Sequence, residues 1–471
     1  MPDMNQPISR RELLNRAAGG FGALALRGML AELEASEARP MSTNPLAPKP
    51  SHFPAKAKNV IFLFMGGGVS HVDSFDPKPK LVEDHNKSLT VHNYRGSIGE
   101  FKQYLKRPQW EFRPRGESGI EISDLFPYVG EVADDLCVIR SLTTDHIAHY
   151  EATLGMHTGS FSFARPSMGS WISYGLGTEN RNLPSFVVVT GATPYARGQN
   201  WNNDFLPGFH QGTQVFPGKT PIPNVKRRVA SSELQSAELE LLQQINQQHL
   251  ETRVLDDQLD ARIRSFETAF GMQQAAPEVL DFSKETQATL DLYGLQPGQN
   301  TGFGWQCLVA RRMVERGVRF VECIDVGSSN NWDSHGNMLD HARLAKNVDQ
   351  PIAGLIKDLK LRGLLDETLV VWTTEFGRTP YMAAKNAGGR DHHPMVFSSW
   401  MAGGGIKGGI THGASDEHGI AVADKRVHVH DFHATILHLL GIDHTRLTYR
   451  HAGRDYRLTD VFGNVVEEIL A

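Results

Sequence analysis

Short apolar runs alternate with stretches of helical periodicity along most of the chain. Four of these runs, at 59–64, 136–139, 319–324 and 368–373, are rich in the β-branched and aromatic residues that favour strands. Between the last two, leucine, isoleucine and valine recur at helical spacing from 339 to 359. A strand, a helix and a second strand form a right-handed unit of a parallel sheet. The pattern therefore predicts an α/β fold with a mainly parallel sheet sandwiched by helices.

The rest of the pattern divides the chain into regions. A polar helical stretch rich in Gln and Glu begins near residue 231, and we interpret the region from about 230 to 300 as a helical insertion. A proline-rich segment precedes the first strand and is typical of a linker. We expect a signal region over 1–40, a linker over 41–57 and one large domain over 58–471.

The first forty residues contain a predicted targeting signal. Ser9-Arg10-Arg11-Glu12 precedes a weakly apolar run at 17–26, a pattern typical of a twin-arginine export signal. The run is far shorter than the ~20 residues that a membrane-spanning helix needs, and no later segment reaches that length. We therefore expect a bacterial protein that the twin-arginine translocation machinery exports folded. The mature chain is expected in the periplasm or outside the cell, with no transmembrane segment.

The composition of the chain argues against nucleic-acid binding and against a disulfide framework. The chain has 471 residues, and its 48 basic and 53 acidic residues give a formal charge of −5. That balance provides no electrostatic footprint for nucleic acid, so we expect no nucleic-acid partner. Three cysteines, an odd number in apolar surroundings, indicate buried free thiols and no disulfide framework.

Polar residues gather where the predicted strands end. In an open α/β sheet, the loops at the carboxyl ends of parallel strands lie along one edge, which is where ligands bind. The four predicted strands are followed in turn by His71 and Asp73, by His149, by Asp333 and His335, and by Glu375 and Arg378, with Arg390, His392 and His393 further on. Neutral imidazoles together with carboxylates suit zinc or manganese better than calcium, which remains a further candidate.

Several segments resemble the alkaline phosphatase and sulfatase superfamily. Residues 363–377 end in Thr374-Glu375-Phe376-Gly377 and resemble the segment of those enzymes that ends in Ser/Thr-Asp-His/Asn-Gly. Residues 156–159 resemble the Leu-Leu-Thr-Gly that follows the sulfatase nucleophile, and residues 431–442 resemble a late sulfatase helix. Together with the export signal, the stretches 332–335 and 389–394 resemble more closely an uncharacterised bacterial family of sulfatase-like proteins, known only as a domain of unknown function.

This resemblance implies a set of site residues. Asp333 and His335 match the Asp and His of the first metal, His393 or its neighbour His392 matches a third ligand, and Glu375 stands at the aspartate of the second metal. The sequence departs from the pattern in three places: Phe376 replaces a His or Asn, Gly66 and Gly67 replace acidic ligands, and His149 stands near the nucleophile position. Either His71 and Asp73 supply the missing ligands from a longer loop, or the second metal is absent.

These residues support a leading function and two alternatives. The first is an exported metal-dependent hydrolase of sulfate or phosphate esters, acting on small-molecule or glycan substrates, with His149 as nucleophile or general base and Arg378 or Arg390 as an anion clamp. The second is a catalytically degenerate descendant that binds a glycan or a surface partner. The third is a transferase or isomerase that acts on phosphorylated or sulfated sugars.

Overall fold

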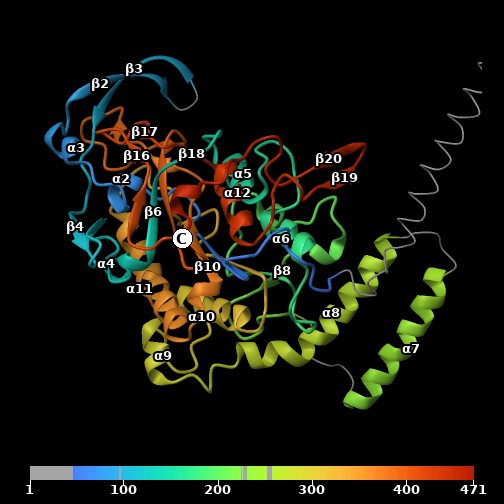
Figure 1. Cartoon of the computed structure of the whole chain (residues 1–471). Coiled ribbons are helices and arrows are strands. Elements are labelled where there is room, and N and C mark those ends of the chain that lie inside the picture. The colour runs from blue at the N-terminus through green and yellow to red at the C-terminus, as the bar shows by residue number, and fades with distance from the viewer. Residues whose placement is uncertain (1–45, 95–96, 224, 226–230, 252–256) are drawn as a thin grey trace, which may run out of the picture. The chain divides into compact units, whose positions relative to one another are not determined.

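A nine-stranded sheet forms the centre of the protein (Figure 1). The structure is a computed structural model that describes residues 46–94, 97–223, 225, 231–251 and 257–471. The strands lie in the order β15 (Ile410–His412), β6 (Leu136–Thr143), β14 (Phe397–Ala402), β10 (Thr368–Thr373), β1 (Asn59–Phe64), β9 (Phe320–Ile324), β7 (Phe186–Thr190) and β8 (Thr213–Val215), while β18 (Val427–His428) also pairs with β6.

The sheet is mainly parallel, as the sequence predicts. Strand β1 pairs in parallel with β10 on one side and with β9 on the other, and β9, β7 and β8 continue in parallel. Strand β14 runs antiparallel between β10 and β6. All four strands predicted from the sequence are present, and three of them, β10, β1 and β9, are neighbours at the centre of the sheet. The α/β class is therefore confirmed.

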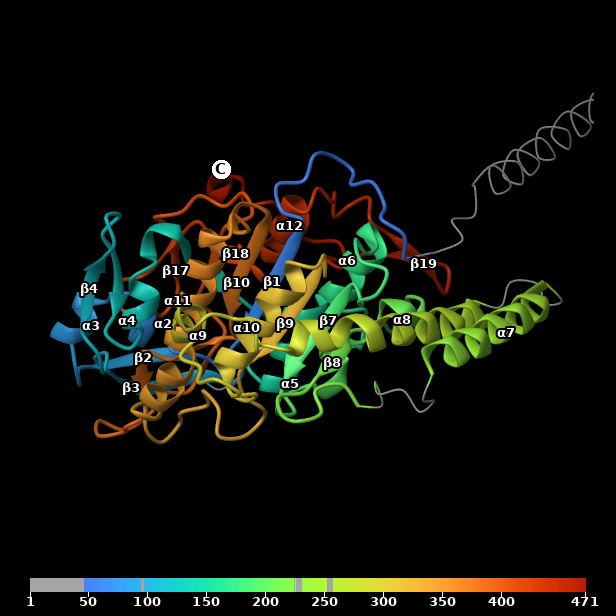
Figure 2. The ribbon, with the colours of Figure 1, turned by 90° about the horizontal axis from the view of Figure 1, so that it is seen from below.

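Helices cover both faces of this sheet (Figures 1 and 2). Because successive side chains of a strand point to opposite faces, Ile61 and Leu63 enter one apolar core while Phe62 and Phe64 enter the other. The first core also contains residues of α10 (Phe303–Val314) and α11 (Asp340–Leu361), and the second contains residues of α5 (His149–Thr158), α6 (Met168–Leu176) and α12 (Val429–Leu439). Burial on both faces explains why the strands are almost continuously apolar.

Several short strands form smaller sheets outside the main one. Strands β2 (Ser88–Tyr94) and β3 (Ser97–Leu105) form a hairpin, and β12 (Tyr381–Met382) pairs antiparallel with β3. Strand β11 (Gly377–Arg378) pairs antiparallel with β13 (His392–His393). The short helices α2 (His71–Ser74) and α3 (Pro79–Glu83) connect β1 to the hairpin.

The region between β8 and β9 is helical. It contains α7 (Ser232–Glu251), α8 (Asp257–Leu280) and α9 (Gln287–Leu292), and α7 packs against α8 through the pairs Gln235–Gln273 and Gln243–Glu267. The predicted export signal lies outside the described residues. None of the described helices has both the length and the apolar character required to cross a bilayer.

A charged pair lies inside the second core. His157 of α5 places Nε2 2.7 Å from Glu322 Oε1 of β9, with side chains only 3% and 1% exposed. The Nδ1 atom of the same ring lies 2.7 Å from the carbonyl oxygen of Thr153. Since both nitrogens face acceptors, the ring is satisfied only when both carry hydrogen. Burial opposes that charge, but Glu322 outweighs it and raises the pKa of His157 above its ordinary 6.5.

Replacing Glu322 by Gln tests this buried pair. Because the folded-state pKa of His157 is raised, the pair contributes fully to the free energy of unfolding below about pH 6.5. This contribution is lost as the pH rises through the folded-state pKa. We expect Glu322→Gln to lower the free energy of unfolding by about 1.5–3 kcal/mol near pH 6 and by clearly less near pH 9, measured by denaturant titration. The exposed Glu417→Gln is the control, and a loss that is independent of pH contradicts the charged pair.

Candidate metal centre

The loops that follow β1, β9 and β10 meet at the carboxyl edge of the sheet, next to the first residue of α5. Gly67 makes this meeting sterically feasible. Its φ is +115°, and a Cβ atom there would lie 2.6 Å from the backbone nitrogen of Trp332 and 2.8 Å from that of Asp333. Only glycine accepts both the conformation and this close approach, so the turn after β1 brings the 331–333 loop directly over the strand end.

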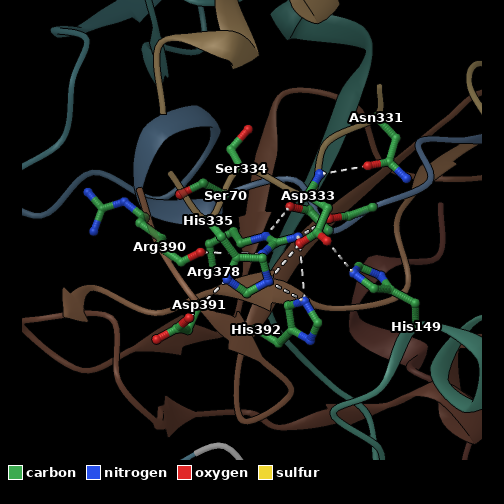
Figure 3. Close-up of polar contacts among 12 residues, drawn as sticks. Ser70, His149, Asn331, Asp333, Ser334, His335, Arg378, Arg390, Asp391 and His392 are labelled. Carbon is green, nitrogen blue, oxygen red and sulfur yellow. Dashed lines mark hydrogen bonds and ion pairs between the residues drawn. The ribbon is translucent and has the colours of Figure 1, made fainter. Parts of the chain in front are cut away.

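Asp333 lies at the centre of the resulting cluster (Figure 3). Its Oδ1 atom is 2.6 Å from Arg378 Nη2, 3.0 Å from His335 Nε2 and 3.1 Å from His392 Nε2. Its Oδ2 atom is 3.2 Å from His149 Nε2. Partial burial opposes ionisation, but the three imidazoles and the guanidinium outweigh it and hold the pKa of Asp333 far below its ordinary value. The carboxylate is therefore ionised across the physiological range.

Each of the three imidazoles is anchored through its Nδ1 atom. The anchors are Glu375 Oε1 at 2.6 Å from His149, the carbonyl oxygen of Ile147 at 2.7 Å from His392, and Asp391 Oδ1 at 2.9 Å from His335. A carbonyl or an ionised carboxylate can only accept, so Nδ1 carries the hydrogen in each ring. All three Nε2 atoms are consequently directed at Asp333.

This arrangement fits a bound transition metal. Among the described residues, His149, Asp333 and His392 form a group whose ligand atoms all lie within 4.8 Å of one another. The Nε2 atom of His149 is buried and makes no hydrogen bond, even though it faces Asp333. Imidazoles that donate Nδ1–H to an outer acceptor and present Nε2 inward are the usual ligands of zinc and of similar metals. The donor set therefore suits zinc or manganese.

The imidazoles differ in their affinity for protons. Burial lowers the pKa of His392, and the nearby Asp333 compensates only in part. Burial also opposes protonation of His149, but Asp333 and Glu375 outweigh it and raise its pKa. His335 is the most exposed of the three, and hydrogen bonds to Asp333 and Asp391 raise its pKa to about 9.

Aromatic rings enclose the histidines. Tyr195 stacks on His149 with ring centroids 4.3 Å apart and planes 4° apart, and its hydroxyl accepts a hydrogen bond from Asn331. The fully buried Phe376 lies 4.9 Å from the His149 ring and 4.6 Å from the His392 ring. Phe376 therefore occupies the space beside the imidazoles where the superfamily pattern leads one to expect a His or Asn.

The short ribbon β11–β13 explains why neighbouring histidines separate. Arg378 is directly opposite His392 in the antiparallel pair, so both side chains lie on the face that looks at Asp333. Gly377 is opposite His393, whose ring lies on the other face and stacks on His71 with centroids 5.7 Å apart. The rings of His71 and His393 bond to the carbonyl oxygens of Gly419 and Ile420. These two predicted ligands thus form a second buried pair outside the Asp333 cluster.

The two predicted arginine clamps also have internal partners. Arg390 and Asp73 form a fully buried ion pair of 2.7 Å, and the other donors of Arg390 reach the carbonyl oxygens of Thr379, Lys106 and Arg107. Figure 3 shows the Arg390 guanidinium pointing away from Asp333. Arg378 is at the cluster, where it binds Asp333 and the carbonyl oxygens of Gly67 and Gly68.

Glu375 stands behind His149. Its carboxylate is fully buried and accepts from the backbone nitrogen of Gly67 at 2.8 Å and from His149. Burial opposes its ionisation, yet His149 and the neighbouring donors lower its pKa. Of the predicted site residues, the structure brings together His149, Asp333, His335, Glu375, Arg378 and His392, and it places His71, Asp73, Arg390 and His393 elsewhere.

Three further groups contact the imidazoles of the cluster. Asp391 belongs to the stretch 389–394 singled out in the sequence, and the structure shows that it anchors His335. The carbonyl of Ile147 carries no signal in the sequence, because any residue supplies a carbonyl. Tyr195 lies outside every motif, and only the fold brings it onto His149.

Comparison with known proteins gives the family. The family described as "Protein of unknown function (DUF1501)" matches residues 57–470. The chain belongs to this family. The family resemblance inferred from the sequence is confirmed to that extent, and a comparison with curated proteins finds no match.

Solved structures share only a distant likeness with this DUF1501 protein. The lipoteichoic acid synthase LtaP from Listeria monocytogenes is 10% identical with a TM-score of 0.36, covering 88% of this chain and 78% of that one. The PsFucS1 sulfatase from Pseudoalteromonas sp. is 13% identical with a TM-score of 0.35, covering 82% and 68%. Alkaline phosphatase from the Antarctic bacterium TAB5 is 11% identical with a TM-score of 0.32, covering 82% and 98%. Scores at this level establish nothing about the chemistry of this chain.

Neighbouring histidines provide a matched test of the metal centre. We expect His392→Ala to abolish stoichiometric zinc or manganese, because it removes one of three ligands, whereas His393→Ala keeps the metal because its ring lies on the opposite face of β13. Glu375→Gln should weaken metal affinity about 10–100-fold, since it alters the anchor of His149 and leaves the three ligands in place. Elemental analysis measures the metal content, and competition with a chelator measures the metal affinity. Circular dichroism verifies that each variant is folded. Equal metal loss in both histidine variants contradicts this assignment.

Proposed function

We propose that His149, Asp333 and His392 hold one divalent cation, zinc or manganese, and that the protein hydrolyses sulfate or phosphate esters. The observation that carries the proposal is the convergence of the anchored imidazoles on one ionised carboxylate at the carboxyl edge of the sheet. When bound, a cation supplies polarisation of the ester oxygen and stabilises the charge that develops in the transition state.

Other residues of the cluster position the proposed metal ligands. In this assignment, Glu375 and the Ile147 carbonyl fix the orientation of the two ligand imidazoles. Arg378 neutralises part of the charge of Asp333 and holds the glycine turn in place. His149 thus becomes a ligand, a different role from the nucleophile or base considered from the sequence.

His335 is the proton donor in this proposal. It lies outside the three-residue ligand group, its side chain is 41% exposed, and Asp391 holds its Nδ1–H at 2.9 Å. Its Nε2 faces the centre, where a proton on that atom passes to the leaving oxygen of a bound ester as water attacks the sulfur or phosphorus, and the proton released by that water restores His335. The Asp391–His335 pair therefore orients the group that protonates the leaving alcohol.

Leaving-group dependence tests this function. After reconstitution with zinc or manganese, we expect wild-type protein to hydrolyse aryl sulfates, phosphate monoesters or phosphodiesters and His149→Ala to lose this activity. His335→Asn should slow esters of poor leaving groups about 10²–10⁴-fold but slow nitrophenyl esters much less, because nitrophenolate departs without a proton. Rates are measured by product release. No turnover of any ester in metal-loaded protein removes the hydrolase proposal.

A non-catalytic binder is the second candidate. The observation in its favour is that Arg378 and Arg390 spend their donors on internal carbonyl and carboxylate groups, so neither guanidinium is available as the anion clamp foreseen from the sequence. Metal content combined with a glycan-binding screen distinguishes the two. Saturable glycan binding by wild type and by His149→Ala alike, without turnover, favours the binder.

The proposed location is the periplasm or the extracellular medium. It is supported by the Arg10-Arg11 motif ahead of an apolar run. Changing both arginines to Lys should leave the protein in the cytoplasm, because the translocation machinery reads the pair. Cell fractionation followed by immunoblotting measures this, and undiminished export of the double variant refutes the signal.

A further inference from the structure

A cavity of about 740 Å³ opens beside the metal centre. His392 and Asp391, one a proposed ligand and the other the anchor of His335, form part of its wall. The cavity therefore adjoins the position where the reacting group of an ester would bind. Its volume falls in the range of about 300–1,000 Å³ that is usual for small-molecule sites.

Part of the lining is apolar. This apolar wall comprises Leu89 and Val91 of β2, Ile147, Met395 and Ile420. Met395 is 56% exposed, and methionine adapts its shape to varied apolar ligands. An apolar group gains from contact with this wall.

The apolar wall is fixed to the site by the chain itself. Strand β12 begins three residues after Arg378, and its Tyr381 and Met382 pair with Leu105 and Tyr104 of β3. Strand β3 in turn holds β2, which supplies the hairpin part of the wall. The same short segment therefore positions the Asp333 cluster and the hairpin, and this sets the separation of the two.

The geometry points to a binding pocket for an apolar alcohol, aromatic or long-chain, on the leaving side of the ester. This inference rests on the proposed function, because it names the substrate class for the same centre. The charged anion binds at the His149–Asp333–His392 group, and the hydrocarbon part lies against β2, Met395 and Ile420. Asp145 and Arg426 also line this cavity, and both line a second cavity of about 540 Å³.

Paired esters test the pocket. With the metal-loaded full chain, we expect 2-naphthyl phosphate or 2-naphthyl sulfate to have a KM at least about tenfold lower than the methyl ester of the same anion. Met395→Asp should raise the KM of the naphthyl ester about tenfold, with little change in kcat or in either constant for the methyl ester. Met395→Leu should restore the wild-type values, and Val82→Asp, at an exposed apolar position on α3, is the control for an added surface charge.

The outcomes separate this inference from the proposed function. If neither ester is hydrolysed, the function fails, and equilibrium binding of 2-naphthyl phosphate by calorimetry decides the pocket: binding that Met395→Asp weakens supports it, and no binding overturns it. If both esters are hydrolysed with equal KM and Met395→Asp changes neither, the function stands and the apolar pocket is wrong.

Discussion

The arrangement of the site depends on a single ionised carboxylate, that of Asp333. Three imidazoles and one guanidinium surround it within 3.2 Å, supplied by α5, by the loop of Asp333 itself and by the β11–β13 ribbon. Each of these groups is held in place by a second contact: the imidazoles by Glu375, by the Ile147 carbonyl and by Asp391, and the guanidinium by the carbonyl oxygens of the glycine turn. Removing the carboxylate would leave those groups without the negative charge that brings them together.

Two local features of the backbone determine which side chains face one another in this cluster. The positive φ and absent side chain of Gly67 allow the 331–333 loop to approach the end of β1, which places Asp333 over the sheet edge. In the short ribbon of β11 and β13, the two histidines of β13 point to opposite faces, because they are adjacent residues of one strand. His392 faces the carboxylate and His393 faces His71, so a shift of one residue in this pairing would exchange a proposed metal ligand for a buried structural ring.

Much of the architecture is predictable from the sequence because apolar periodicity reports burial directly. The strands β1, β6, β9 and β10 and the helix α11 are each expected from their own residues, and parallel strands oblige their carboxyl ends to share an edge. That rule correctly brings Asp333, His335, Glu375 and His149 together. The roles inside the cluster are less predictable, because they depend on which atom of a ring or carboxylate faces which partner. Glu375, predicted at the position of a second metal, contacts His149 Nδ1 and the backbone of Gly67.

The sequence by itself determined the α/β class, the central strands and the set of polar residues available at the sheet edge, since all of these follow from local periodicity and chain direction. Only the tertiary structure decided that Asp73 pairs with Arg390, that His71 stacks on His393, and that Tyr195 and Asp391 complete the cluster. These are contacts between residues far apart in the chain, set by turn conformation, strand register and side-chain packing. No local pattern encodes such distances, because the same residue types satisfy a buried ion pair, a stacked ring or a metal ligand equally well.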